Sequence, residues 1–277
     1  MTSSLVTDLL QGVHDACVGD RSGVSRDPIP ERETIDPDAF GICLATIDGH
    51  VYEVGDTRAP FPIQSISKAF TYGLALEDRG AEAVAAKIDV EPSGEPFNEI
   101  SVDPGTGRPR NPMINAGAIT ASSLIAGDTP AEQFRHVQSV FSAYADRRLE
   151  LGEDVLRTEV RAGDRNRAIG YLLREVGTLT CDPNDALDVY LRQCSLLVDC
   201  RDLALMAATL ANAGIQPRTG ERLAAVETVD RILSVMTTCG MYDAAGDWVA
   251  EVGLPAKSGV GGGIIAVLPG QVALAVF

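Results

Sequence analysis

The pattern of apolar and polar positions predicts strands near both ends of the chain and helices between them. Residues 3–17 repeat apolar side chains at helical spacing, which predicts an amphipathic helix. The runs FGICLATI and HVYEVGD flank Asp48-Gly49, a pair typical of the tight turn in a β-hairpin. Pro62 then precedes a helix predicted over 64–77, which Gly80 ends.

The second half of the chain predicts helices followed by two strands. Long helices are expected over 131–214, where DPNDALDVYLRQC begins with an Asp cap and RDLALMAATLANAG ends in glycine. Residues 258–277 carry no charge, and we expect strands at Gly263–Leu268 and Val272–Phe277 with a turn at Pro269-Gly270. Glycines, Pro269 and Gln271 interrupt this run, so it favours buried strands over a membrane span.

This order of elements predicts an α/β (α+β) fold, with a mainly antiparallel sheet, flanking helices and a helical domain. We place the sheet domain at residues 1–61 and 225–277 and the helical domain at 62–224. The carboxy-terminal strand should then pair beside the amino-terminal hairpin. An active site is expected between the two domains.

Charge and cysteine usage narrow the classes of function. The 277 residues carry a net charge of −16, which repels phosphate backbones and anionic lipid, so we expect neither a nucleic acid nor a membrane as partner. Six cysteines lie far apart without a C-x-x-C pair, and there are three histidines, so neither a metal site nor a disulfide framework is expected. The start, MTSSLVTDLL, lacks the pattern of a signal peptide, and we expect a cytoplasmic protein.

Lysine is scarce in this chain. There are 23 basic residues, of which three are lysines: Lys68, Lys87 and Lys257. Because arginine supplies nearly all the positive charge, a retained lysine is a candidate for work that arginine cannot do, such as losing a proton.

Ser65 and Lys68 form the first candidate site. Their spacing of three places both side chains on one face of the predicted helix, within hydrogen-bond reach. A desolvated lysine can remove the proton of a serine hydroxyl, and the helix amino end can stabilise an oxyanion. The alternative is a helix-capping serine followed by an exposed lysine, and S-x-x-K alone does not exclude it.

Lys257-Ser258-Gly259 is the second candidate motif. S-x-x-K followed later by K-[ST]-G is the pattern of serine-acylating β-lactamases and penicillin-binding proteins. A glycine-rich strand edge lets a backbone N–H approach the reacting carbonyl. The S-x-N or Y-x-N motif of those enzymes is absent from the chain, which argues for a relative with another substrate.

Longer segments identify such a relative. The chain closely resembles the serine-dependent glutaminases from about residue 20 to its end, through the segments FPIQSISKAF, RNPMINAGAI, YLRQCSLLVDCRDLALMAATLANAG, TCGMYDAAG and GLPAKSGVGGGIIAV. The resemblance implies a β-lactamase-like fold and hydrolysis of L-glutamine to L-glutamate and ammonia, without metal or organic cofactor. We also expect a homo-oligomer, either a dimer or a tetramer.

The resemblance also implies roles for individual residues. Ser65 corresponds to the nucleophile, Lys68 to its partner and Tyr242 to a proton carrier, while the backbone N–H of Val260 completes the oxyanion hole. The matching substrate-binding positions are Ser65, Asn115, Glu159, Asn166, Tyr190, Tyr242 and Val260. A carboxylate such as Glu159 suits the ammonium of glutamine, and neutral amides suit its other polar groups. Taken singly, these residues would be a solvated carboxylate, turn or cap amides and core tyrosines.

Two features depart from the family pattern. Pro28 stands in the sequence Asp27-Pro28-Ile29-Pro30, where family members commonly carry an active-site tyrosine, so a hydroxyl is missing. The sequence ends at Phe277 within a predicted strand, where the family usually continues into a final helix, so we expect a truncated chain or altered packing.

Two other functions fit parts of the pattern. One is a β-lactamase or peptidase of the same fold, which the missing middle motif disfavours. The other is a non-catalytic amino-acid sensor, which the retention of both Ser65 and Lys68 disfavours, since a binding protein needs no acylating pair.

Overall fold

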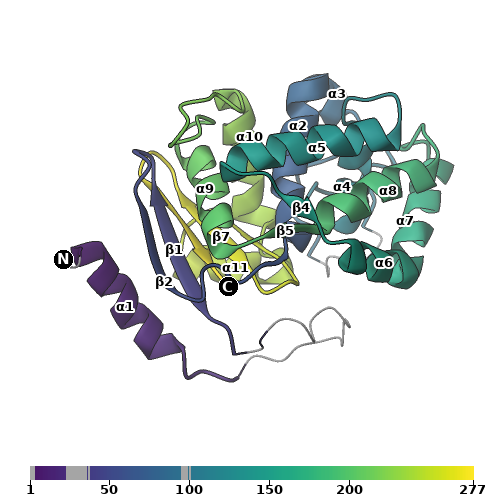
Figure 1. Cartoon of the computed structure of the whole chain (residues 1–277). Coiled ribbons are helices and arrows are strands. Elements are labelled where there is room, and N and C mark those ends of the chain that lie inside the picture. Colours follow the sequence, from purple (N-terminus) through teal and green to yellow (C-terminus); the bar gives the residue numbers. More distant parts are fainter. Residues whose placement is uncertain (1–3, 23–35, 37, 95–98, 100) are drawn as a thin grey trace.

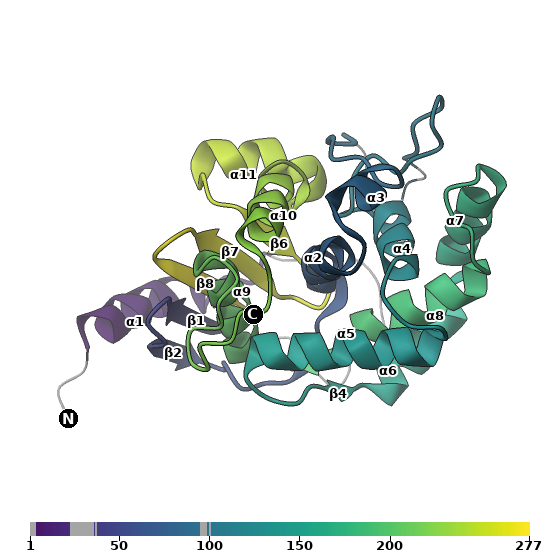
Figure 2. The ribbon, with the colours of Figure 1, turned by 90° about the horizontal axis from the view of Figure 1, so that it is seen from above.

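A computed structural model describes residues 4–22, 36, 38–94, 99 and 101–277, and Pro28 lies outside this part of the chain. Figures 1 and 2 show a sheet with helices on both faces beside a cluster of helices. No helix among the described residues is long and apolar enough to cross a membrane.

The main sheet has five antiparallel strands in the order β2-β1-β8-β7-β6. Its strands are β1 (Gly41–Thr46), β2 (Val51–Gly55), β6 (Ala256–Ser258), β7 (Ile264–Leu268) and β8 (Val272–Val276). The pairing of β8 with β1 confirms that the carboxy-terminal strand lies beside the amino-terminal hairpin. The turns fall where the sequence predicts them, with Gly49 and Gly270 in left-handed backbone conformations that favour glycine.

Alternation along the strands separates the two faces of this sheet. Ile42 and Val54 pack with Leu10 of helix α1 (Leu5–Cys17) on one face. Cys43 and Ala275 face the main core on the other. Because side chains alternate along a strand, consecutive residues serve two different interfaces. Helix α9 (Cys200–Ala211) packs against β8, β1 and β7 on this second face (Figure 1).

The remaining helices are divided between the sheet side and the helical cluster (Figure 2). They are α2 (Ser67–Arg79), α3 (Ala81–Ala85), α4 (Asn115–Ser123), α5 (Pro130–Ala145), α6 (Glu153–Ala162), α7 (Asp164–Glu175), α8 (Pro183–Cys194), α10 (Val226–Cys239) and α11 (Ala245–Glu251). Helix α4 packs against α2, α7 and α8, while α10 packs against α2 and reaches β6. Helix α2 therefore lies between the sheet side and the helical cluster (Figure 2).

The region predicted as long helices contains two short strands. A second sheet has the order β3-β5-β4, formed by β3 (Phe61–Pro62), β4 (Glu150–Leu151) and β5 (Leu196–Val198). Strands of two or three residues contain too few positions for an alternating pattern, so hydrophobic periodicity does not predict them. Helix α9 covers the main sheet although it lies within 62–224, and the division into two domains stays a prediction.

Candidate active site

Ser65 lies at a sharp turn between a strand and a helix. Strand β3 ends at Pro62, a short 3-10 turn spans Gln64–Ile66, and α2 begins at Ser67. Gln64 has φ 48°, a left-handed conformation that is unusual for a residue with a side chain. This turn leaves Ser65 9% exposed between Ile63 and Ile66, which are fully buried. The Ser65 hydroxyl is thus held at the amino end of a helical segment.

Lys68 lies one helical turn after Ser65 and is fully buried. Its Nζ donates a hydrogen bond of 2.6 Å to Oδ1 of Asn115. Burial lowers the pKa of Lys68 to about 8, because the charged form loses its hydration. At pH 7 about a tenth of Lys68 is then a neutral amine, the form that can accept a proton, and this fraction grows as the pH rises toward 8.

Asn115 links three helices to this lysine. It is the first residue of α4, and its Oδ1 also accepts a hydrogen bond of 3.2 Å from the hydroxyl of Tyr190 on α8. Its Nδ2 donates to Oδ1 of Asn166 on α7 at 2.9 Å. Four residues far apart in the sequence, Lys68, Asn115, Asn166 and Tyr190, thus form one connected group.

Glu159 joins the same region from helix α6. Its Oε1 accepts a hydrogen bond of 2.8 Å from Nε2 of Gln64, the residue just before Ser65. Glu159 is half-buried, so its carboxylate keeps some contact with solvent. The carboxylate is therefore held next to the turn that carries the serine.

Tyr242 approaches Ser65 from the sheet side. It begins a short 3-10 turn, Tyr242–Ala244, with φ 57°. Burial raises the pKa of Tyr242, and its hydrogen bond with Ser65 partly opposes that rise. Nζ of Lys257 lies 2.8 Å from the Tyr242 hydroxyl. Tyr242 is thus a neutral phenol between a serine hydroxyl and a buried amine.

The segment after β6 packs against the turn at Ser65. A Cβ atom on Gly261 would lie 2.6 Å from the carbonyl oxygen of Pro62, and one on Gly259 would lie 3.2 Å from that of Ile63. Larger residues would force the two segments apart. Val260 is 45% exposed, so its side chain is not part of the packed interior.

Comparisons with known proteins agree on one family. The model of the glutaminase family matches residues 23–277. The chain belongs to the glutaminase family. Glutaminase 2 of Bradyrhizobium diazoefficiens is 54% identical over 268 residues, covering 97% of this chain and 43% of that protein. Glutaminase of Microcystis aeruginosa is 48% identical, covering 97% of this chain and 79% of that protein.

Solved structures of glutaminases share the fold of the whole chain. A crystal structure of Mglu in its glutamate form has a TM-score of 0.95 and 41% identity, covering 100% of this chain and 64% of that one. A probable glutaminase has a TM-score of 0.96 and 37% identity, covering 90% of its own length. The α/β, β-lactamase-like fold predicted from sequence is therefore confirmed. The chain spans less than half the length of the two Bradyrhizobium relatives, since each is covered over 43%.

Sequence reasoning missed two side chains of this glutaminase-family site. Gln64 binds Glu159 across 95 residues of sequence, and no local pattern marks that contact. Lys257 was noted within its motif but was not assigned to the site. The scarcity of lysine was a usable signal, because two of the three lysines are fully buried and both lie beside Tyr242.

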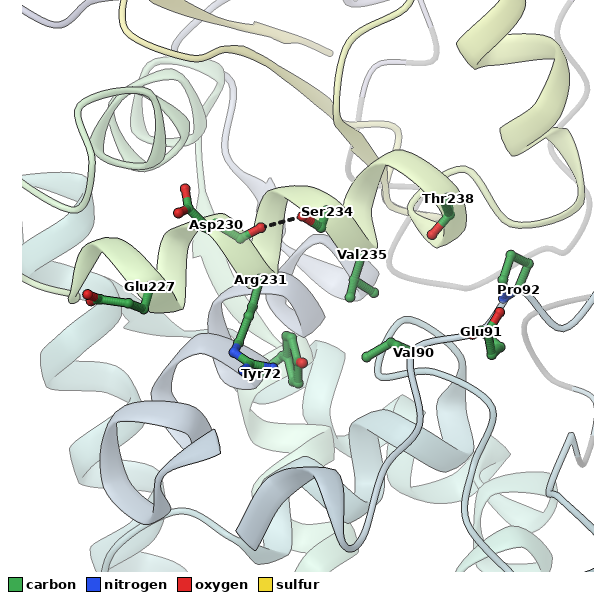
Figure 3. Close-up of a pocket in the computed structure, with 10 residues that line it drawn as sticks. All are labelled: Tyr72, Val90, Glu91, Pro92, Glu227, Asp230, Arg231, Ser234, Val235 and Thr238. Carbon is green, nitrogen blue, oxygen red and sulfur yellow. Dashed lines mark hydrogen bonds between the residues drawn. The ribbon is translucent and has the colours of Figure 1, made fainter. Parts of the chain in front are cut away.

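Two cavities flank the site without containing its predicted residues. One of about 560 Å³ lies between α2, α10 and residues 90–92 (Figure 3), where Arg231 and Val235 of α10 face Tyr72 and Val90. The other, of about 910 Å³, is bordered by β3 and α6, the elements next to Ser65 and around Glu159. In the part of the chain described, no group of three or more His, Cys, Asp or Glu side chains could hold a metal ion.

Proposed function

We propose that this chain hydrolyses the side-chain amide of L-glutamine to L-glutamate and ammonia through an ester on Ser65. The observation that carries the proposal is the buried Lys68 one turn from Ser65, with its pKa lowered to about 8. A structural lysine would keep its charge in solvent or beside a carboxylate, whereas a base must be able to lose its proton.

The first step forms the ester. Lys68 and Tyr242 take the proton of Ser65 as its oxygen attacks the amide carbon. The N–H groups of Ser65 and Val260 then stabilise the oxyanion, since both belong to segments that pack together and the first lies at the start of a helical segment. Collapse of this intermediate breaks the C–N bond, and the nitrogen leaves as ammonia after taking the proton.

The second step returns the enzyme to its starting state. Water attacks the ester carbon and gives up a proton to the same basic groups. The C–O bond to Ser65 then breaks, and the serine oxygen regains its proton. L-Glutamate leaves, and no proton is gained or lost by the site over the cycle.

Substrate recognition follows from the charges around Ser65. Glu159 provides a carboxylate for the substrate ammonium, and its exposed fraction leaves room for a ligand. Asn115, Asn166 and Tyr190 provide neutral polar groups for the substrate carboxylate or amide. Neutral groups suit the carboxylate or amide of the substrate, because the site already contains two buried amines, Lys68 and Lys257.

Ammonia release from L-glutamine by the purified chain tests the function, with nitrocefin as a control for β-lactam hydrolysis. We expect ammonia and no nitrocefin turnover. The mass of a glutamyl group on Ser65 in acid-quenched protein would demonstrate the ester. A protein that binds glutamine without releasing ammonia would contradict the proposal and favour a sensor.

We also propose a homo-oligomer, a dimer or a tetramer, in the cytoplasm. The oligomer is supported by the resemblance to the glutaminases. The cytoplasm is supported by six cysteines that lie far apart in the sequence without a C-x-x-C pair, which suits a reducing compartment. Light scattering after size exclusion measures the mass in solution, and a monomer at micromolar concentration would contradict the oligomer.

A further inference from the structure

Gln193 of α8 is a fully buried amide that contacts two other helices. Its Oε1 accepts a hydrogen bond of 2.8 Å from the hydroxyl of Thr71 on α2, and Oγ of Ser122 on α4 lies 3.3 Å from the same oxygen. Its Nε2 donates to Oγ of Ser67, the first residue of α2, at 3.5 Å. One side chain therefore joins three helices through polar contacts in the interior of the molecule.

The hydrogen bond from Thr71 differs from the one that a buried hydroxyl commonly makes in a helix. Thr120 and Thr209 are also fully buried, and each donates to the carbonyl oxygen four residues earlier in its own helix. Such a bond needs no partner outside the helix. Thr71 donates instead to Gln193, so its hydrogen bond depends on how α2 and α8 are placed relative to each other.

A buried glutamine is a demanding way to fill a core. Burial removes the hydration of both ends of the amide, and each end then needs a hydrogen-bond partner. Methionine would fill a similar volume without that need. A buried polar group that is fully paired specifies one arrangement of the elements around it. We therefore interpret Gln193 as a residue that fixes an arrangement of helices.

Ser67 extends the contacts of Gln193 to the turn that carries Ser65. The Ser67 hydroxyl has one proton, which it donates at 2.6 Å to the carbonyl oxygen of Gln64. Its oxygen can then accept from Gln193, so the three groups form a chain from amide to hydroxyl to carbonyl. Gln64 has the left-handed φ of 48°, and α8 packs against its turn. The chain thus holds the backbone just before Ser65.

The helices that Gln193 joins are those that carry the polar groups around Lys68. Lys68 directly follows Ser67 in α2, and its Nζ donates to Oδ1 of Asn115 at 2.6 Å. Asn115 begins α4, and the same oxygen accepts from the hydroxyl of Tyr190 on α8. Each of these bonds joins two helices, so a small shift of one helix would lengthen it. The placement of α2 against α4 and α8 therefore decides whether Lys68 keeps its partner.

We propose that Gln193 is a positioning residue, which holds α2 against α4 and α8 so that Ser65 and Lys68 keep their reactive geometry. This inference rests on the proposed serine reaction. Gln193 acts through Thr71 and Ser67, and it neither transfers a proton nor binds substrate. Its loss should slow the chemical step more than it weakens binding, because a displaced nucleophile and base meet the bound amide less often in line.

The test compares Gln193→Met with Gln216→Met as the matched control. Met has a similar length and volume and lacks the amide. Gln216 is also fully buried, and its Oε1 accepts the N–H groups of Arg218 and Thr219 in the loop after α9. We expect Gln193→Met to lower kcat per folded molecule by about 10–100-fold and to change KM by less than about threefold. Gln216→Met should lower the melting temperature and leave kcat per folded molecule at the wild-type value.

Two milder variants serve if Gln193→Met does not fold. Thr71→Val removes a hydroxyl at similar shape, and Ser67→Ala removes the link to the carbonyl of Gln64. Each should lower kcat per folded molecule by about 3–10-fold, the factor that one hydrogen bond is worth. In a folded Gln193→Met protein, adding Thr71→Val should slow the reaction no further.

Three outcomes would overturn the inference. One is a Gln193→Met enzyme that melts at a lower temperature but keeps kcat per folded molecule within about threefold of wild type, as a purely structural residue would. Another is a loss that multiplies when Thr71→Val is added to Gln193→Met. The third is wild-type kcat in both Thr71→Val and Ser67→Ala.

Labelling of Ser65 with a fluorophosphonate separates this inference from the proposed function. The labelling rate reports the reactivity of the serine without glutamine turnover, and Ser65→Ala gives the background. We expect slower labelling in Gln193→Met than in wild type or Gln216→Met. A wild-type protein that is labelled in this Gln193-dependent way yet releases no ammonia would refute the glutaminase proposal and keep the positioning role. Equal labelling rates in Gln193→Met and Gln216→Met would refute the positioning role alone.

Discussion

Helices α2 and α9 are both buried along most of their length, but they bury different chemistry. After the buried Asp202 in its first turn, the buried residues of α9 are mainly aliphatic, and Thr209 near its end bonds to the carbonyl of Leu205 in its own helix. In α2 the buried residues include Lys68 and Thr71, whose partners lie on other helices. The apolar helix packs on the sheet, whereas the hydrogen bonds of α2 to other helices fix the positions of Lys68 and Thr71.

This difference predicts which property, stability or activity, each kind of variant should change. Apolar packing depends on volume and tolerates residues of similar size. A buried hydrogen-bonded amine depends on geometry and on its charge state. Variants of α9 should therefore change stability with little effect on chemistry, and variants around the start of α2 should do the reverse.

The largest effect is expected for Ser65→Ala and Lys68→Arg. The first removes the nucleophile. The second keeps a positive charge that cannot be lost at working pH, so the proposed base is removed. Each should lower kcat by at least about 10²–10⁴. Ammonia release measures it, with Lys87→Arg as the control.

Two further measurements extend this test: the rate of the double variant and the melting temperature of Ser65→Ala. If Ser65 and Lys68 act as one unit, as proposed, the double variant should be little slower than either single one. Melting temperatures should barely change for Ser65→Ala. A Lys68→Arg protein that turns over glutamine at the wild-type rate would contradict the mechanism, even if the chain is a glutaminase.

On α9, Leu203→Ala should give a large loss of stability. Leu203 is fully buried, and its Cδ1 lies where a Cβ on Gly263 would approach to 3.1 Å. The cavity should lower the free energy of unfolding by about 2–5 kcal/mol. Denaturant titration measures this loss, and Leu203→Met should cost less than about 1.5 kcal/mol. A loss of kcat per folded molecule in Leu203→Ala would contradict the expectation that variants of α9 change stability and not activity.

Glu159→Gln should weaken substrate binding without affecting either helix. The variant keeps the shape of the side chain and removes the charge that we propose binds the substrate ammonium. We expect binding weaker by about 1.5–3 kcal/mol, the range for a hydrogen bond to a charged group. Steady-state kinetics give KM, and Glu153→Gln on the exposed start of α6 is the matched control. An unchanged KM for L-glutamine would show that Glu159 has another role.

The main sheet could be predicted from sequence because its signals are local. Asp48-Gly49 and Pro269-Gly270 mark two turns, and the uncharged final run leaves buried strands as the economical structure. The second sheet could not be predicted in this way. Its strands are two or three residues long, and β3 pairs with β5 across more than a hundred residues.

The candidate site likewise contains some residues that local sequence patterns indicate and others that they do not. Ser65 and Lys68 lie within one helical turn, so spacing alone suggested their interaction. Asn115, Glu159, Asn166 and Tyr190 came from resemblance, because no local pattern separates them from cap or surface residues. The contact between Lys257 and Tyr242 depends on how α10 and α11 return the chain to β6, which is a property of the fold.

The smallest effect expected is the pH dependence that Lys68 gives to both activity and stability. Its folded pKa is lowered from 10.5 to about 8, so the neutral form grows as pH rises through about 8 and kcat/KM should rise with it. Between about 8 and 10.5 the unfolded chain binds this proton and the folded chain does not, so the contribution of Lys68 to stability also rises with pH there. The neighbouring Cys194 has a pKa raised to about 11 by burial and stays a neutral thiol near pH 8. A rate profile that is flat through pH 8 at constant ionic strength would show that a charged Lys68 does not limit the reaction.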